Sequence, residues 1–173
     1  MIRRDDAALL VIDVQDGFSS YKCFEDVVRQ AGRLVAGTQI LRVPLIVTEQ
    51  YPKGLGPTNA GVGLPEGTEP IEKTVFSGVR ADGFQLHGRS QVILCGIAAH
   101  VCVAQTALDL LDQGIEVFLA CDAVGSRHKH DKKVALRRLA AAGCIETTVE
   151  AVLLELCERA GTDEFKAVQG VIK

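Results

Sequence analysis

The chain has 173 residues and contains no tryptophan, one methionine and five prolines, and aromatic side chains make up only 5% of it. Its longest apolar runs are only as long as a buried strand, and residues 1–6 are polar, unlike the start of a signal peptide. We therefore expect no membrane association and a cytoplasmic location. Because 47% of the residues are hydrophobic, we expect one domain with a substantial core over residues 1–173.

Neither sign of charge predominates in the sequence. The formal net charge is -3, and the basic residues look dispersed along the chain, so we expect no nucleic-acid partner. The six cysteines form no CxxC pair, which disfavours both a disulfide framework and a zinc site. Neither GxGxxG nor GxxxxGK[ST] occurs, which argues against dinucleotide binding and disfavours phosphate chemistry. We expect no metal and no other cofactor.

Apolar runs of strand length alternate with helical patterns along the chain. The strands are expected at residues 7–13, 45–49, 71–76, 92–95, 116–120 and 144–149, and the helices at 24–41, 83–87, 101–113, 131–142 and 150–159, with a closing segment capped by Thr162. Residues 121–130 are expected to form a polar loop, and Asp131 is expected to cap the helix that follows. This order predicts an α/β fold: a doubly wound, parallel six-stranded sheet with helices on both faces. Residues 50–70 are rich in glycine and proline and are predicted to form a long substrate loop.

Cys102 lies where a buried strand that ends near Gly96 turns into a helix. Unpaired amide groups and the positive end of the helix dipole would favour the thiolate, which is the nucleophilic form of cysteine. The alternative is a small buried hydrophobic side chain, as most free cysteines are.

Three further positions leave alternatives open. Asp13 ends the first strand, where α/β sheets bind ligands, but aspartate also commonly begins turns. Lys73 is either a solvated surface lysine or a buried cation that keeps a carboxylate ionised. His128 and His130 could bind a metal, although a solvated turn is favoured because no carboxylate or thiol cluster accompanies them.

Several motifs resemble those of the isochorismatase-like cysteine hydrolase superfamily, which includes nicotinamidases and carbamoylsarcosine amidases. They are Val11-Ile-Asp-Val-Gln15, Glu72-Lys-Thr74 and Gly96-Ile-Ala-Ala-His-Val-Cys-Val103. Residues 48–56, 99–110 and 122–127 resemble more closely the isochorismatase domain-containing hydrolases. The resemblance covers nearly the whole chain and implies a Rossmann-type three-layer α/β/α fold.

The resemblance also implies a catalytic apparatus. Cys102 would be the nucleophile, Asp13 the general base and Lys73 the cation that orients them. A cis peptide between Ile97 and Ala98 would turn the amides of Ala98 and Cys102 toward an oxyanion.

The reaction implied is metal-independent hydrolysis of a small amide or related carbonyl compound through a Cys102 thioester. The substrate pocket is expected to include Gln15, Phe18, Tyr51 and His100. The family is commonly oligomeric, so a homo-oligomer, either a dimer or a tetramer, is expected.

Departures from the wider family bear on the substrate. Nicotinamidases place metal ligands after the second strand, whereas residues 50–70 contain no histidine or aspartate, so neither zinc nor nicotinamide is favoured. The isochorismatases that cleave a vinyl ether lack the nucleophilic cysteine, and Ala98 stands where an acidic residue is expected in the closer subgroup. Three alternatives stay open: vinyl-ether hydrolysis by Asp13 and Lys73 alone, a non-catalytic binding or scaffold protein, and a thiol sensor.

Overall fold

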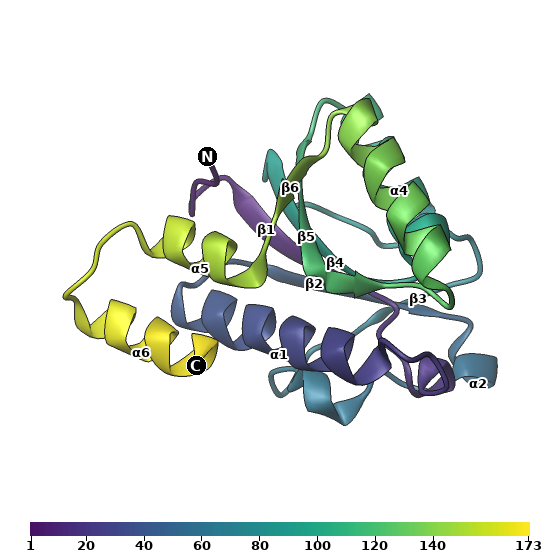
Figure 1. Ribbon diagram of the computed structural model, residues 1–173, viewed down its shortest axis with the longest axis horizontal. Helices are drawn as coiled ribbons and strands as arrows, with labels where there is room; N and C mark the ends of the chain where they lie inside the picture. The colour runs from purple at the N-terminus through teal and green to yellow at the C-terminus, as the bar shows by residue number, and fades with distance from the viewer.

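The computed structural model describes residues 1–173 and contains one parallel sheet of six strands, which confirms the predicted α/β architecture (Figure 1). The strands are β1 (Ala7–Ile12), β2 (Leu45–Gln50), β3 (Ile71–Lys73), β4 (Gln91–Ile97), β5 (Glu116–Gly125) and β6 (Ile145–Thr147). They lie in the order β3-β2-β1-β4-β5-β6. The strand order reverses between β1 and β4, and open α/β sheets bind ligands beyond the carboxyl ends of the strands at such a reversal.

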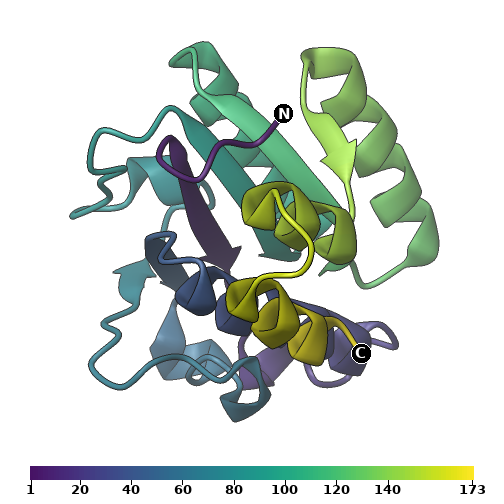
Figure 2. The same ribbon diagram turned by 90° about the vertical axis from the view of Figure 1, so that its left-hand side faces the viewer.

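Six α-helices connect and cover the strands: α1 (Phe24–Ile40), α2 (Pro52–Leu55), α3 (Ala104–Asp112), α4 (Lys129–Ala142), α5 (Val149–Cys157) and α6 (Asp163–Ile172). Helices α1, α5 and α6 pack on one face of the sheet, and α3 and α4 pack on the other. Figure 2 shows α5 and α6 side by side, with the C-terminus at the end of α6. None of these helices combines the length and the apolar character needed to cross a bilayer.

The continuous apolar run of β1 supplies both halves of the core. Ala7, Leu9 and Val11 pack with α1, and the intervening Ala8, Leu10 and Ile12 pack with α3 on the opposite face. All six side chains are fully buried, as expected for a central parallel strand covered by helices on both sides. Full burial of each large aliphatic side chain contributes about 1.5–3 kcal/mol.

A close approach of β1 and β4 requires a glycine at position 96. A Cβ atom on Gly96 would lie 1.9 Å from the carbonyl oxygen of Ile12, and the φ angle of Gly96 is +127°. Any side chain at this position would push apart the two strands that carry the site described below.

Four local predictions are wrong. Residues 83–87 are not helical, because Gly83 and His87 both have left-handed φ angles. The predicted loop after residue 120 continues β5 to Gly125, since Val124 and Gly125 pair with β4 after a shift in register. The long loop contains α2 and a 3-10 turn, Ala60–Val62. Asp131 lies in the first turn of α4, whose N-cap is His128.

The predicted cap of the closing segment is confirmed. The Thr162 hydroxyl accepts a hydrogen bond from the backbone N–H of Phe165, and α6 begins at the next residue after Thr162.

Candidate active site

The carboxylate of Asp13 is held by two side chains at the carboxyl edge of the sheet. Asp13 directly follows β1 in a left-handed conformation with φ +51°, which aspartate tolerates better than most residues. Its Oδ2 accepts a hydrogen bond from Lys73 Nζ at 2.7 Å, and its Oδ1 accepts one from Thr48 Oγ1 at 2.7 Å. Because both carboxylate oxygens have donors, the orientation of Asp13 is fixed.

Lys73 ends β3, and its side chain is fully buried. Its ammonium group donates to three acceptors: Asp13 Oδ2 at 2.7 Å, Gln50 Oε1 at 2.7 Å and the Phe76 carbonyl oxygen at 3.2 Å. An ammonium has three N–H bonds, so all of its donors are used. The surface alternative for Lys73 is therefore wrong, because the ammonium is buried against the Asp13 carboxylate.

Gln50 is a residue of the site that the sequence did not reveal. It ends β2 opposite Lys73 in the strand register, and its Oε1 accepts from Lys73 while lying 4.0 Å from Cys102 Sγ. Its Nε2 donates to the Thr74 carbonyl oxygen at 3.0 Å. Its place at the carboxyl end of a predicted strand, on the same edge as Asp13, was the available signal.

The Cys102 thiol is buried in a π-helical turn, Ala99–Val103, between β4 and α3. Burial and the negative charge of Asp13 raise the pKa of Cys102 to about 12, and Lys73 and the backbone N–H of Ala98 oppose that shift. The prediction that the helix start would favour a thiolate is thus wrong for the resting site. The thiol keeps its proton until a base removes it.

Ala98 adjoins the thiol through its backbone. The peptide bond between Ile97 and Ala98 is cis, at the position that the resemblance implied. Ala98 and Cys102 line the same cavity.

The cavity that Cys102 lines has a volume of about 340 Å³, and we name it the catalytic cavity after this candidate nucleophile. Two of the predicted pocket residues, Phe18 and His100, line it together with Cys102. His100 Nδ1 lies 3.1 Å from Ser126 Oγ. The volume is in the range of small-molecule sites.

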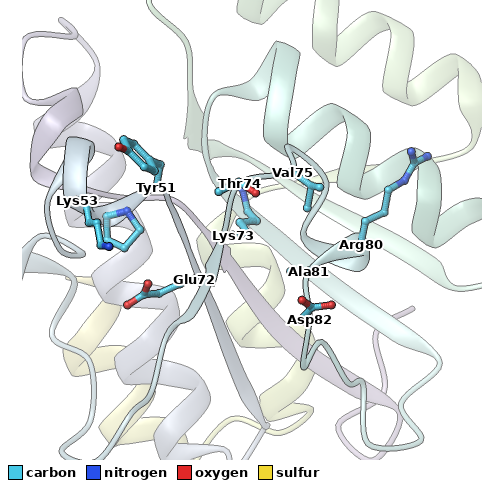
Figure 3. A pocket seen from close by; sticks show the side chains of 10 residues that line it. Tyr51, Lys53, Glu72, Lys73, Thr74, Val75, Arg80, Ala81 and Asp82 are labelled. Atoms are coloured by element: carbon cyan, nitrogen blue, oxygen red, sulfur yellow. The ribbon is translucent and has the colours of Figure 1, made fainter.

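Gln15 and Tyr51 lie outside the catalytic cavity. Gln15 is fully buried, and its Nε2 donates to the carbonyl oxygens of Gln50 and Gly56 at 3.0 and 2.7 Å, so it ties the end of β2 to the following loop. Tyr51 is 55% exposed and lines a separate cavity of about 340 Å³. Figure 3 shows this second cavity, with Tyr51 on one side and Arg80 on the other. The predicted substrate contact is wrong for Gln15, whose amide is fully used by the backbone.

Basic residues gather near the catalytic cavity, contrary to the expectation that they are dispersed. Arg127 and His128 line the cavity, and the adjoining surface of α4 carries Lys129, Lys132, Lys133 and Arg137 around a hollow of about 500 Å³. These residues are close in sequence, and the helix brings four of them to one hollow.

No group of three or more histidine, cysteine, aspartate or glutamate side chains is placed to hold a metal.

Comparisons with known proteins agree along most of the chain. The model of the isochorismatase domain matches residues 7–151. Isochorismatase domain-containing protein 2A of Mus musculus is 40% identical over 173 residues, covering 98% of this chain and 84% of that protein. Isochorismatase domain-containing protein 2 of Danio rerio is 43% identical over 171 residues, covering 96% and 86%. A Caenorhabditis elegans structure described as MAR1 ribonuclease superposes with a TM-score of 0.91 at 41% identity, covering 99% of this chain and 91% of that one.

Proposed function

This chain belongs to the isochorismatase-domain family of hydrolases, and from that premise we propose that it is a metal-independent cysteine hydrolase of small amides or related carbonyl compounds. One observation carries the proposal: a thiol at the wall of a small cavity has a fully buried Asp13–Lys73 pair beside it. A carbonyl carbon is the electrophile that suits a cysteine nucleophile.

In the first half of the proposed reaction, Cys102 Sγ attacks the carbonyl carbon while its proton passes to the Asp13 carboxylate. A base must act during the attack, because the pKa of the thiol is raised to about 12. The tetrahedral intermediate collapses by breaking the C–N bond, and Asp13 returns the proton to the leaving nitrogen. Ammonia or an amine leaves, and a Cys102 thioester remains.

In the second half, water attacks the thioester and gives a proton to Asp13. The C–S bond breaks, the acid product leaves, and the proton returns to the sulfur of Cys102. The backbone amides of Ala98 and Cys102 are the proposed donors to the oxyanion in both halves, since the Ala98 amide is close enough to Cys102 Sγ to oppose the rise in the pKa of the thiol.

The test is ammonia release from a panel of primary amides by the wild-type chain, Cys102→Ala and Cys121→Ala. Cys121 is a matched control, because it is half-buried and does not line the catalytic cavity. We expect Cys102→Ala to lose turnover by about 10³-fold or more and Cys121→Ala to keep it. Intact-mass detection of an acyl adduct on Cys102 supplies the second readout, and turnover undiminished in Cys102→Ala contradicts the proposal.

A second candidate is RNA cleavage, which the description of the Caenorhabditis elegans relative and the basic surface of α4 favour. A labelled RNA oligonucleotide incubated with the same three proteins tests it. Cleavage that depends on Cys102, without turnover of any amide, would replace the amidase proposal. Cleavage of a vinyl ether by Cys102→Ala would instead favour the alternative in which Asp13 and Lys73 act alone.

A homo-oligomer, a cytoplasmic location and a single domain remain predictions.

A further inference from the structure

A groove of about 1070 Å³ adjoins the catalytic cavity. Five residues line both hollows: Phe18, Tyr21, Leu55, Arg127 and His128. The two hollows are therefore neighbours that share these side chains, and a substrate that reacts at Cys102 has the groove beside it.

The groove carries an excess of positive charge that the protein does not neutralise. Lys22, Arg127 and Lys129 line it, and none of these three side chains takes part in an ion pair or donates a hydrogen bond within the chain. Its one carboxylate, Asp26, already pairs with Arg29. The only carboxylate that lines the catalytic cavity is Asp131, which leaves the two hollows together positive.

Arg127 is positioned to receive an anion. Its guanidinium carbon lies 5.5 Å from the centre of the Tyr21 ring, and Tyr21 packs against Phe18 with 5.3 Å between the ring centres. At this distance Tyr21 makes a cation–π contact with the guanidinium, whose N–H groups donate no hydrogen bond within the chain, and the edge of a guanidinium matches the spacing of two carboxylate or phosphate oxygens.

The buried cation at the centre of the site cannot take this role. All three N–H bonds of Lys73 donate to protein oxygens, so a negative charge on the substrate has to be met elsewhere. Arg127 is the only lysine or arginine that lines the same cavity as Cys102, and it has no ion-pair partner.

We propose that this groove binds a phosphate group of the substrate, with Arg127 as the main ligand and Lys22 and Lys129 in support. The substrate would then be a phosphorylated carbonyl compound whose carbonyl carbon lies at Cys102; that placement rests on the proposed function, whereas anion binding in the groove does not. A phosphate fits better than a carboxylate, because the three unpaired cations less the one charge of Asp131 leave about +2, which a dianion meets and a single carboxylate only halves.

The experiment measures how inorganic phosphate affects alkylation of Cys102 by iodoacetamide, followed by peptide mass spectrometry at pH 9 and constant ionic strength. Phosphate bound to Arg127 would narrow the entrance and disfavour the thiolate, so we expect alkylation to slow by at least threefold relative to chloride. Arg127→Gln should abolish this protection. Arg138→Gln is the matched control on the exposed side of α4, and it should keep the protection.

Any other outcome of the labelling experiment would contradict the proposed phosphate subsite. Equal labelling with and without phosphate, or protection that persists in Arg127→Gln, excludes Arg127 as its ligand. Equal protection by acetate at the same concentration means that the groove does not distinguish a phosphate from a carboxylate, which contradicts a phosphate subsite.

A second measurement separates this proposal from the proposed function. The affinity for inorganic phosphate, read from ³¹P NMR line widths, should fall at least fivefold in Arg127→Gln and stay unchanged in Arg138→Gln. If no amide is turned over but the phosphate affinity depends on Arg127, the hydrolase proposal fails and the anion site stands. If phosphate affinity is absent or indifferent to Arg127, the anion site fails whatever Cys102 does.

Discussion

Two ion pairs of this protein have the same N–O separation of 2.7 Å and opposite surroundings. The side chains of Lys73 and Asp13 are fully buried, whereas those of Arg80 and Asp109 are 69% and 21% exposed. The exposed pair even has the better geometry, since Arg80 donates two hydrogen bonds to the Asp109 carboxylate and lowers its pKa. Burial, rather than distance, decides what the loss of each pair would do, because only the buried pair has no water to replace a missing partner.

The largest effect is expected from Asp13→Asn. The substitution removes the proposed base and leaves the Lys73 ammonium buried without its counter-charge. We expect turnover of any amide substrate to fall by about 10²–10⁴-fold, as for other general bases. The free energy of unfolding, measured by urea denaturation, should fall by about 3–5 kcal/mol. A variant that keeps wild-type stability would show that Lys73 finds another partner.

Gln50→Ala should give the next largest effect. It removes one of the three acceptors of Lys73 and leaves an N–H of a buried ammonium unpaired. We expect a loss of about 1–3 kcal/mol in the free energy of unfolding. Gln50→Glu keeps an acceptor at the same place and should restore most of that stability, and failure of this rescue would count against the hydrogen-bond explanation.

Of the two ion pairs, only the buried one should affect the reactivity of the Cys102 thiol. Because its pKa is raised to about 12, alkylation of the wild-type thiol by iodoacetamide should keep rising with pH beyond 9, where ordinary thiols begin to level off. Asp13→Asn removes a charge that raises this pKa, so alkylation at pH 8 should speed up by roughly tenfold while hydrolysis is lost. An unchanged labelling rate in this variant would mean that burial alone sets the pKa.

The smallest effect is expected from Asp109→Asn. Arg80 is exposed enough for water to take the place of the lost carboxylate, so the midpoint of urea denaturation and the labelling rate of Cys102 should both match those of the wild type within error. A clear loss of stability would show that the exposed pair is coupled to the buried one through the cavity that Lys73 and Arg80 both line.

The sheet could be predicted because its signals are local. Residues 7–12 form an unbroken apolar run that is typical of a strand buried on both faces, and Gly114 marks the turn after α3. The helix prediction for residues 83–87 is wrong because Gly83 and His87 have left-handed φ angles, and the loop prediction for residues 121–125 is wrong because the shifted register depends on pairing with a strand distant in sequence.

The candidate site was only partly predictable for the same reason. Asp13, Lys73 and Cys102 stand in motifs, but Gln50 and Thr48 are ordinary polar residues whose importance comes from the register of β2 against its neighbours. The direction of the Cys102 pKa shift was missed because the effect of burial and of a carboxylate placed by another strand exceeds that of the helix start. The cationic groove could not be predicted either, because it forms where the loop before α1 meets the start of α4, and neither segment indicates this contact on its own.

The three oxygen contacts of Lys73 also limit the covalent chemistry open to this lysine. Imine formation with an aldehyde or ketone needs a free amine lone pair, and this nitrogen is held as an ammonium among three acceptors in a site closed to solvent. A carbonyl compound that enters the cavity therefore meets sulfur as its only nucleophile near the buried pair. Borohydride added with such a compound should leave Lys73 unmodified while exposed lysines such as Lys166 are reductively alkylated.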